Sequence, residues 1–161
     1  MQSETALQEY ASRFDEPVRS LLRAKVRNQV WSITPEESVY RAIEIMSERQ
    51  VGCLVVLTGG RLAGIVSERD YARKVVLRGR GSQETHVREI MTTPALFVTP
   101  EKTVAESMRI MTSRRVRHLP VLEGDTVVGM LSIGDLVNWV ITSQQQTIKH
   151  LHNYIAGNYP A

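Results

Sequence analysis

The sequence contains a single cysteine, Cys53, and no long hydrophobic run. One cysteine excludes an intramolecular disulfide and agrees with a reducing compartment. The longest apolar stretches, such as 53–57, have the length of a strand and fall far short of a membrane-spanning helix. The first residues also lack the basic start and apolar core of a secretory signal. We therefore expect a cytoplasmic protein with no membrane partner.

Charge of either sign is modest, but the basic residues are unevenly divided. The chain has 161 residues, 42% of them hydrophobic, which suits one globular domain or an intimate pair of subdomains. Its net charge is +3, with sixteen Arg and only four Lys. Guanidinium groups suit bidentate contacts with phosphate or carboxylate, so the bias is compatible with an anionic ligand. Codon bias in the source genome would explain it equally well.

The sequence contains two copies of one pattern, offset by 65 residues with no gap. The shift places Thr34-Pro35-Glu36 on Thr99-Pro100-Glu101. It also places Gly64, Ser67 and Asp70 on Gly129, Ser132 and Asp135. A unit of this length is too long for a solenoid repeat and too short for two independent domains. We therefore expect the two copies to pack on each other, with the cleft between them as the first place to look for function.

Each copy shows the same order of predicted elements. An apolar residue is followed by Thr-Pro-Glu and a stretch of helical spacing, so Thr34 and Thr99 are predicted helix N-caps with proline at the first helical position. Pairs of short apolar runs joined by glycine-bearing turns predict hairpins near 53–66 and 118–131, and a second helix follows each hairpin. The order β-α-β-β-α, twice, predicts an α+β fold.

The segments outside the repeats are predicted to be helical. Leu7, Ala11, Phe14, Val18, Leu21 and Leu22 follow helical spacing, with a break expected at Pro17. A short helix is expected at 87–91, and a long one from Asp135 through Ile155, which could cap its own core or serve an interface. The expected organisation is an N-terminal helical segment at 1–25, repeat 1 at 26–80, a linker at 81–94, repeat 2 at 95–143, and a C-terminal helix and tail at 144–161.

The element Gly-x-x-Ser-x-x-Asp occurs at 64–70 and again at 129–135, where a strand ends and a helix begins. A serine hydroxyl and the free N–H groups of a helix N-terminus can receive a phosphate. An aspartate three residues later lies one turn away and can accept hydrogen bonds from the vicinal hydroxyls of a ribose. Plain helix capping by Ser and Asp is the alternative, and for one copy alone it would be favoured. Because the element occurs at the same position in both copies, ligand binding is favoured over capping alone.

These motifs together resemble the cystathionine-β-synthase (CBS) domain, and the pair resembles a Bateman module. The resemblance covers residues 26–143 and includes the run Arg115-Val116-Arg117-His118-Leu119-Pro120-Val121. Small stand-alone bacterial CBS pairs are the most similar, in Ser67-Glu68-Arg69-Asp70-Tyr71 and in the C-terminal helix around 147–151. The resemblance implies a pseudo-two-fold module of three-stranded sheets and helices that binds adenosine-containing ligands in two clefts and dimerises.

The resemblance also implies that each cleft draws on both copies. One cleft would place Met130, Ser132 and Asp135, with Arg117 and His118, at the ribose and phosphate, and Thr34, Val39, Val51, Gly52 and Cys53 at the base. The other would place Ile65, Ser67 and Asp70 opposite Thr99, Val104, Val116 and the backbone around Arg117 and His118. Gly52-Cys53 stands where copy 2 has Arg117-His118, so the second cleft lacks the phosphate-contacting pair. Either Arg69, Arg73 or Arg115 replaces it, or the cleft prefers a ligand with a different phosphate placement, or it stays empty. We therefore expect the Asp135 cleft to be the main AMP-type site.

The favoured function is a non-enzymatic regulatory module. It would be a homodimer that senses an adenine nucleotide, AMP first and NAD(H), ADP or ATP as alternatives, and signals to a partner protein. No nucleophile has an activating base at recognisable spacing, so no enzyme is expected. No metal site is expected either, because His150 and His152 point to different faces of a helix. The alternative is an RNA or single-stranded nucleic-acid-binding module, since the pI is about 9.2. Steep salt dependence of binding would distinguish that alternative.

Overall fold

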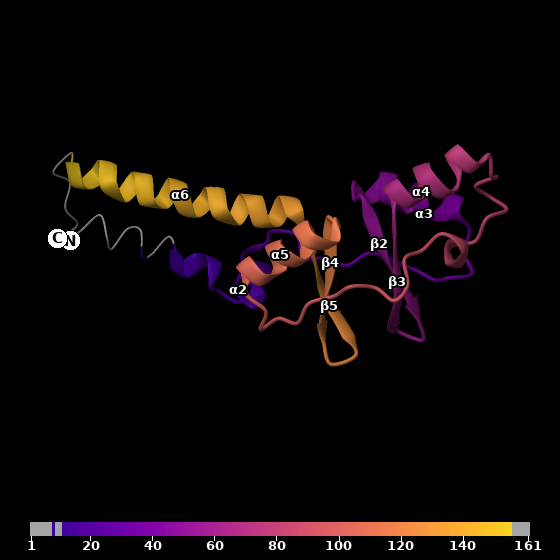
Figure 1. The fold of residues 1–161 in the computed structure, drawn as a ribbon, viewed down its shortest axis with the longest axis horizontal. Coiled ribbons are helices and arrows are strands. Elements are labelled where there is room, and N and C mark those ends of the chain that lie inside the picture. The colour runs from indigo at the N-terminus through magenta and orange to yellow at the C-terminus, as the bar shows by residue number, and fades with distance from the viewer. Residues whose placement is uncertain (1–7, 9–10, 156–161) are drawn as a thin grey trace. The chain divides into compact units, whose positions relative to one another are not determined.

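The computed structural model describes residue 8 and residues 11–155, with only some side chains beyond residue 142. The expected place of Leu7 and the side chains of His150, Leu151 and Ile155 lie outside this part. The described elements are α2 (Val18–Ala24), β1 (Ser32–Ile33), α3 (Val39–Arg49), β2 (Cys53–Thr58), β3 (Arg61–Ser67), α4 (Glu68–Lys74), the 3₁₀ turns η1 (Val76–Arg78) and η2 (Val87–Glu89), α5 (Val104–Arg114), β4 (His118–Glu123), β5 (Thr126–Ser132) and α6 (Ile133–Ile155) (Figure 1). This mixture of helices and strands confirms the predicted α+β class.

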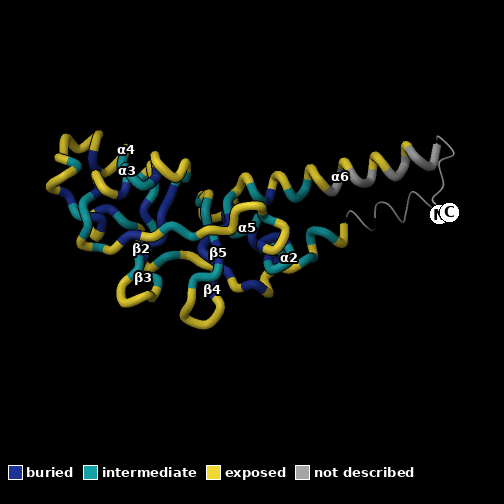
Figure 2. The backbone as a smooth tube through the Cα atoms, turned by 180° about the vertical axis from the view of Figure 1, so that it is seen from behind, coloured by how far each residue is buried: buried dark blue, intermediate teal, exposed yellow. Residues whose placement is uncertain are grey.

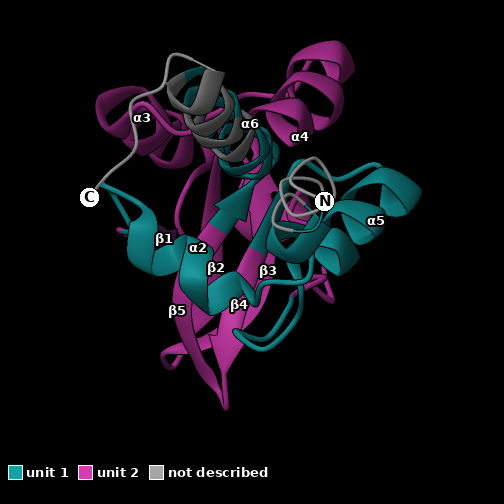
Figure 3. Cartoon of the chain, turned by 90° about the vertical axis from the view of Figure 1, so that its left-hand side faces the viewer, with its two compact units in different colours: residues 1–28, 98–119, 131–161 teal, residues 29–97, 120–130 magenta. Residues whose placement is uncertain are grey.

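The chain forms two compact units, and both draw on both copies of the repeat. Unit 1 comprises residues 1–28, 98–119 and 131–161, and unit 2 comprises residues 29–97 and 120–130 (Figure 3). Each unit is described by itself below.

Unit 2 contains a three-stranded sheet in the order β1-β2-β3. Strand β1 runs parallel to β2, and β2 runs antiparallel to β3 with Cys53 opposite Ser67. Helices α3 and α4 contact each other, and they contact β2 and β3 respectively. Strand β2 is largely buried, most residues of β3 are half-buried, and the hairpin turn is exposed (Figure 2). The core consists of Ile33, Val39, Ala42, Met46, Leu54, Val56, Val66, Val75, Val87 and Ile90.

The predicted N-caps at Thr34 and Thr99 are wrong by one turn. Helix α3 begins after Ser38, whose hydroxyl accepts a hydrogen bond from the Arg41 N–H at 3.2 Å. Helix α5 begins after Thr103 in the same way. Thr34 instead closes a turn, in which its N–H and hydroxyl donate to the Glu37 carboxylate at 2.9 and 3.0 Å. The sequence offers two capping residues in succession, and the proline fixes the first in the turn rather than at the helix start.

The two hairpins are confirmed, but the sheets of the two copies differ. Gly59, Gly60 and Gly124 adopt positive φ in the turns, a conformation that costs glycine little. Copy 2 forms the two-stranded sheet β4-β5. At the position of copy 2 that corresponds to β1, the structure has the single bridged residue Val98, where the family resemblance implies a first strand. Among the described residues, a three-stranded sheet is therefore present in copy 1 alone.

The N-terminal segment docks on the start of α5 in unit 1. Residues 11–14 are helical, Pro17 forms an isolated bridge with Thr103, and α2 begins at Val18, which confirms the predicted break. Val18 N–H donates to the Lys102 carbonyl at 2.8 Å, and Val104 N–H donates to the Glu16 carbonyl at 2.9 Å. The apolar face of α2 is buried, and α2 contacts α5. The segment thus packs against α5 within unit 1.

The linker between the copies docks on the start of α3 in unit 2 by the same pattern. Val87 N–H donates to the Glu37 carbonyl at 2.9 Å, and Val39 N–H donates to the Thr85 carbonyl at 2.8 Å. The short helix expected after residue 86 is the 3₁₀ turn η2. The linker is therefore part of the packed structure of unit 2.

Helix α6 confirms the long C-terminal helix, with 23 residues. Its exposed large apolar side chains are Ile133, Val137, Ile141 and Ile148. In the described part of the chain, no helix combines the length and the apolar character that crossing a membrane requires.

Gly64, the first residue of the repeated motif, is required by a close approach of backbone. A Cβ at this position would lie 2.7 Å from the Thr92 carbonyl oxygen and 3.1 Å from the Met91 sulfur. Thr92 cannot retreat without loss, because it exchanges two backbone hydrogen bonds with Ile65, at 3.1 and 2.8 Å. We predict that Gly64→Ala lowers the free energy of unfolding by about 1–3 kcal/mol, measured by urea denaturation.

Gly134 provides the matched control for this substitution. A Cβ there meets only the Ser132 hydroxyl, at 3.6 Å, and the residue lies in the first turn of α6. Gly134→Ala should leave stability unchanged or raise it by up to about 1 kcal/mol. Equal effects of the two substitutions would contradict the assigned role of Gly64.

Candidate functional site

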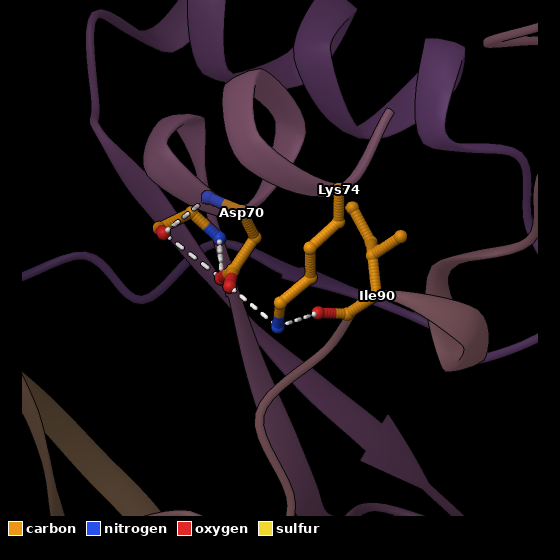
Figure 4. A network of polar contacts seen from close by, with 4 residues as sticks. Asp70, Lys74 and Ile90 are labelled. Atoms are coloured by element: carbon orange, nitrogen blue, oxygen red, sulfur yellow. Dashed lines mark hydrogen bonds and ion pairs between the residues drawn. The ribbon is translucent and has the colours of Figure 1, made fainter. Parts of the chain in front are cut away.

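In copy 1, Ser67 and Asp70 form a reciprocal cap at the start of α4 (Figure 4). Ser67 N–H and Ser67 Oγ donate to Asp70 Oδ2 at 3.0 and 2.9 Å, and Asp70 N–H donates to Ser67 Oγ at 3.2 Å. Lys74 Nζ lies 2.9 Å from Asp70 Oδ1 and donates to the Ile90 carbonyl at 2.7 Å. The carboxylate is thus held by its own helix, whose lysine is fixed by the linker.

The strand beside this cap contributes a neutral thiol. Cys53 is buried and lies opposite Ser67 in the sheet, while Glu68 N–H donates to the Gly52 carbonyl at 3.1 Å. Burial, with smaller effects of the Asp70 and Glu68 carboxylates, raises the pKa of the Cys53 thiol to about 12. Neither Gly52 nor Cys53 can therefore offer a positive charge to an anion.

Copy 2 repeats the cap at the start of α6. Ser132 N–H donates to Asp135 Oδ2 at 2.8 Å, and Asp135 N–H donates to Ser132 Oγ at 3.1 Å. Ile133 N–H donates to the Arg117 carbonyl at 2.9 Å, which is the counterpart of the contact between Glu68 and Gly52. The structure therefore brings Arg117, Ser132 and Asp135 together in unit 1.

The carboxylate of copy 2 is met by a lysine from a distant segment. Lys25 Nζ donates to Asp135 Oδ2 at 2.9 Å, and the side chains of Lys25 and Asp135 are 19% and 21% exposed. The position equivalent to Lys74 is Trp139, whose Nε1 donates to the Arg13 carbonyl at 3.3 Å. Sequence reasoning missed Lys25. The available signal was the tryptophan that replaces lysine one turn after Asp135.

His118, at the start of β4, completes the charged cluster of unit 1. Burial lowers the pKa of His118 below its ordinary value; the Asp135 carboxylate opposes this shift, and the positive charges of Arg117 and Lys25 add to it. At neutral pH the imidazole is therefore uncharged, and the fixed positive charges here belong to Lys25 and Arg117. We call Lys25, Arg117, His118, Ser132 and Asp135 the unit 1 cluster.

The predicted site residues divide between the two units. Thr34, Val39, Val51, Gly52, Cys53, Ile65, Ser67, Arg69, Asp70 and Met130 belong to unit 2, and Thr99, Val104, Val116, Arg117, His118, Ser132 and Asp135 belong to unit 1. Val39 and Val104 are fully buried at the first positions of α3 and α5. The assignment of any of these residues to a base-binding side stays a prediction.

The unit 1 cluster combines the groups that recognise a sugar phosphate. The capping role of Ser and Asp is confirmed in both copies, but it does not use up the carboxylate. An ionised carboxylate accepts about four hydrogen bonds, so Asp135 can cap α6 and still receive hydroxyl groups. The N-terminus of α6, Lys25 and Arg117 favour an anion beside it. Among the described residues, no three His, Cys, Asp or Glu side chains gather as metal ligands.

The lowered pKa of His118 predicts a pH dependence of stability. The unfolded chain binds a proton at this histidine more readily than the folded chain does. The free energy of unfolding should therefore fall as pH drops below about 6.5, with a slope of up to about 1.4 kcal/mol per pH unit for one proton. Urea denaturation between pH 7.5 and 5.5 should show a shallower slope for His118→Gln than for the wild type. Identical slopes would show that burial of His118 does not oppose its protonation.

Comparison with known proteins identifies the family of the chain. The family model described as "CBS domain" matches residues 18–77 and 87–142. A solved structure from Burkholderia ambifaria, described as a candidate signal-transduction protein with CBS domains, is 47% identical. It covers 80% of this chain and 96% of its own, with a TM-score of 0.77.

Curated relatives include a mitochondrial protein of Arabidopsis thaliana, CBSX3, and YhcV of Bacillus subtilis. CBSX3 is 42% identical over 131 residues, which cover 78% of this chain and 64% of that protein. The chain thus spans less than two thirds of that relative's length. YhcV is 28% identical over 117 residues, which cover 73% of this chain and 83% of YhcV. The two family matches, which together include most of the sequence, and these relatives establish that the chain belongs to the CBS-domain family and carries two CBS domains.

Proposed function

We propose that the chain is a non-catalytic regulatory module that binds an adenosine nucleotide and passes the binding event to a partner protein. The observation that carries the proposal is the unit 1 cluster. There a capped carboxylate able to receive ribose hydroxyls lies 2.9 Å from a lysine ammonium, and the charges of Asp135, Lys25 and Arg117 all act on His118. AMP is the expected ligand, with NAD(H), ADP and ATP as alternatives.

The charges of the two copies favour Asp135 over Asp70 as the ribose-binding residue. Beside Asp70, the strand offers the backbone of Gly52 and a neutral Cys53 thiol. Beside Asp135, the strand offers Arg117 and His118, and the N-terminal segment adds Lys25. An anionic phosphate gains more from the second environment, because charge-assisted contacts are stronger than neutral ones.

The signalling half of the proposal has support from the relatives. The Burkholderia protein is described as a candidate signal-transduction protein with CBS domains, and it is similar over nearly its whole length. A ligand can shift a module between conformations only by its difference in affinity for them, so the output depends on how tightly the nucleotide is held. Homodimerisation, with the exposed apolar side chains of α6 available, remains part of the proposal.

We predict a ligand-induced rise in thermal stability that depends on Asp135. AMP at about 100 times its Kd should stabilise the protein by about 2.7 kcal/mol, or roughly 5–10 °C in Tm. Asp135→Ala should abolish the shift, although loss of the cap will also lower the Tm without ligand by an amount that the comparison subtracts. NAD⁺, NADH, ADP, ATP and S-adenosylmethionine tested in parallel identify the preferred ligand.

Asp70→Ala is the matched control, because it removes the equivalent cap from α4. It should leave the AMP-induced shift largely in place. Loss of the shift in Asp70→Ala but not in Asp135→Ala would overturn the assignment of the site. A response to single-stranded RNA that weakens steeply with salt, with no response to any mononucleotide, would instead favour a nucleic-acid-binding module.

A further inference from the structure

The two capped aspartates are neutralised by lysines of different origin. Asp70 is paired with Lys74, four residues along the same helix, and Lys74 is also tied to the Ile90 carbonyl. Asp135 has Trp139 at the corresponding position and is paired with Lys25, which follows the C-terminus of α2. Of the two capped aspartates, only Asp135, the proposed ribose-binding residue, is therefore paired with a cation from a separate segment.

The pair of Lys25 and Asp135 creates a competition at that carboxylate. Both side chains are about four-fifths buried, so separating them leaves a poorly solvated ammonium without its anionic partner. Truncating or displacing one partner of such a pair is costly chiefly because the other charge is left uncompensated. Hydroxyl groups that approach Asp135 Oδ2 meet this cost, because Lys25 already donates to that atom.

A phosphate on the incoming molecule removes the cost. A nucleotide brings nearly two negative charges to the same cluster, so Lys25 exchanges one anionic partner for another. A neutral nucleoside brings the same hydroxyls and no replacement anion. The cluster is thus arranged to bind the ribose group more tightly together with its phosphate than without it.

We infer that Lys25 is the residue that makes the unit 1 cluster select phosphorylated nucleosides over neutral ones. This inference rests on the proposed function, because it assigns specificity at the same site. It gives Lys25 two roles in sequence: it is the partner of Asp135 before binding, and it contacts the phosphate afterwards. Lys74 has no such role, since its displacement from Asp70 would leave it on its own helix beside the Ile90 carbonyl.

The test is isothermal titration calorimetry of the full chain with AMP and with adenosine. The wild type should bind AMP more tightly, and Lys25→Met should lower the ratio of adenosine Kd to AMP Kd by about tenfold or more, the size of one lost charge-assisted contact. Part of the change should be tighter binding of adenosine, because its hydroxyls no longer compete with an ammonium. Lys25→Arg should preserve most of the selectivity, and Lys74→Met should leave the ratio unchanged.

The ratio of the two Kd values does not depend on the fraction of the variant that is folded. A variant that is only partly folded weakens both ligands by the same factor, which cancels. An unchanged ratio in Lys25→Met, with AMP binding that Asp135→Ala abolishes, would overturn the role of Lys25 and leave the proposed function standing. Failure of the wild type to bind AMP, adenosine and each of the alternative ligands ADP, ATP, NAD⁺ and NADH would overturn both.

Discussion

Both units depend on a backbone contact between the start of a helix and a segment from outside the repeat that contains it. The first N–H groups of a helix have no acceptor within the helix. Val104 N–H finds its acceptor in Glu16, which precedes repeat 1, and Val39 N–H finds its acceptor in Thr85, in the linker. Neither repeat can complete its own first helix without a segment that precedes the other repeat.

The docked segments also determine which charged group lies at each cap. Docking of α2 on α5 fixes the end of α2 in unit 1, and Lys25 follows it directly, within reach of Asp135. In unit 2 the docked linker supplies a carbonyl, that of Ile90, which holds the helix's own Lys74 against Asp70. One docked segment thus contributes a cation and the other an acceptor. The backbone pattern is shared, while the electrostatics of the two copies diverge.

Features that depend on neighbouring residues could be predicted from the sequence, and features set by docking could not. The hairpins, the break at Pro17 and the long C-terminal helix follow from local patterns, and the structure has all three. The caps at Thr34 and Thr99 were misplaced because a second capping residue follows each within four positions. Lys25 was missed because 110 residues separate it from Asp135, and only packing of α2 brings them together.

Helix capping and ligand binding are often treated as competing explanations of a Ser-x-x-Asp motif, but at the proposed site the first would support the second. The cap holds Asp135 in one orientation, so a ligand would not bear the entropic cost of ordering that side chain. Because both copies have the cap, the cap alone cannot distinguish a binding site from a structural helix start. The distinction must come from residues that the repeat does not share. In this chain those residues are Lys25, Arg117 and His118, and all three belong to the unit 1 cluster.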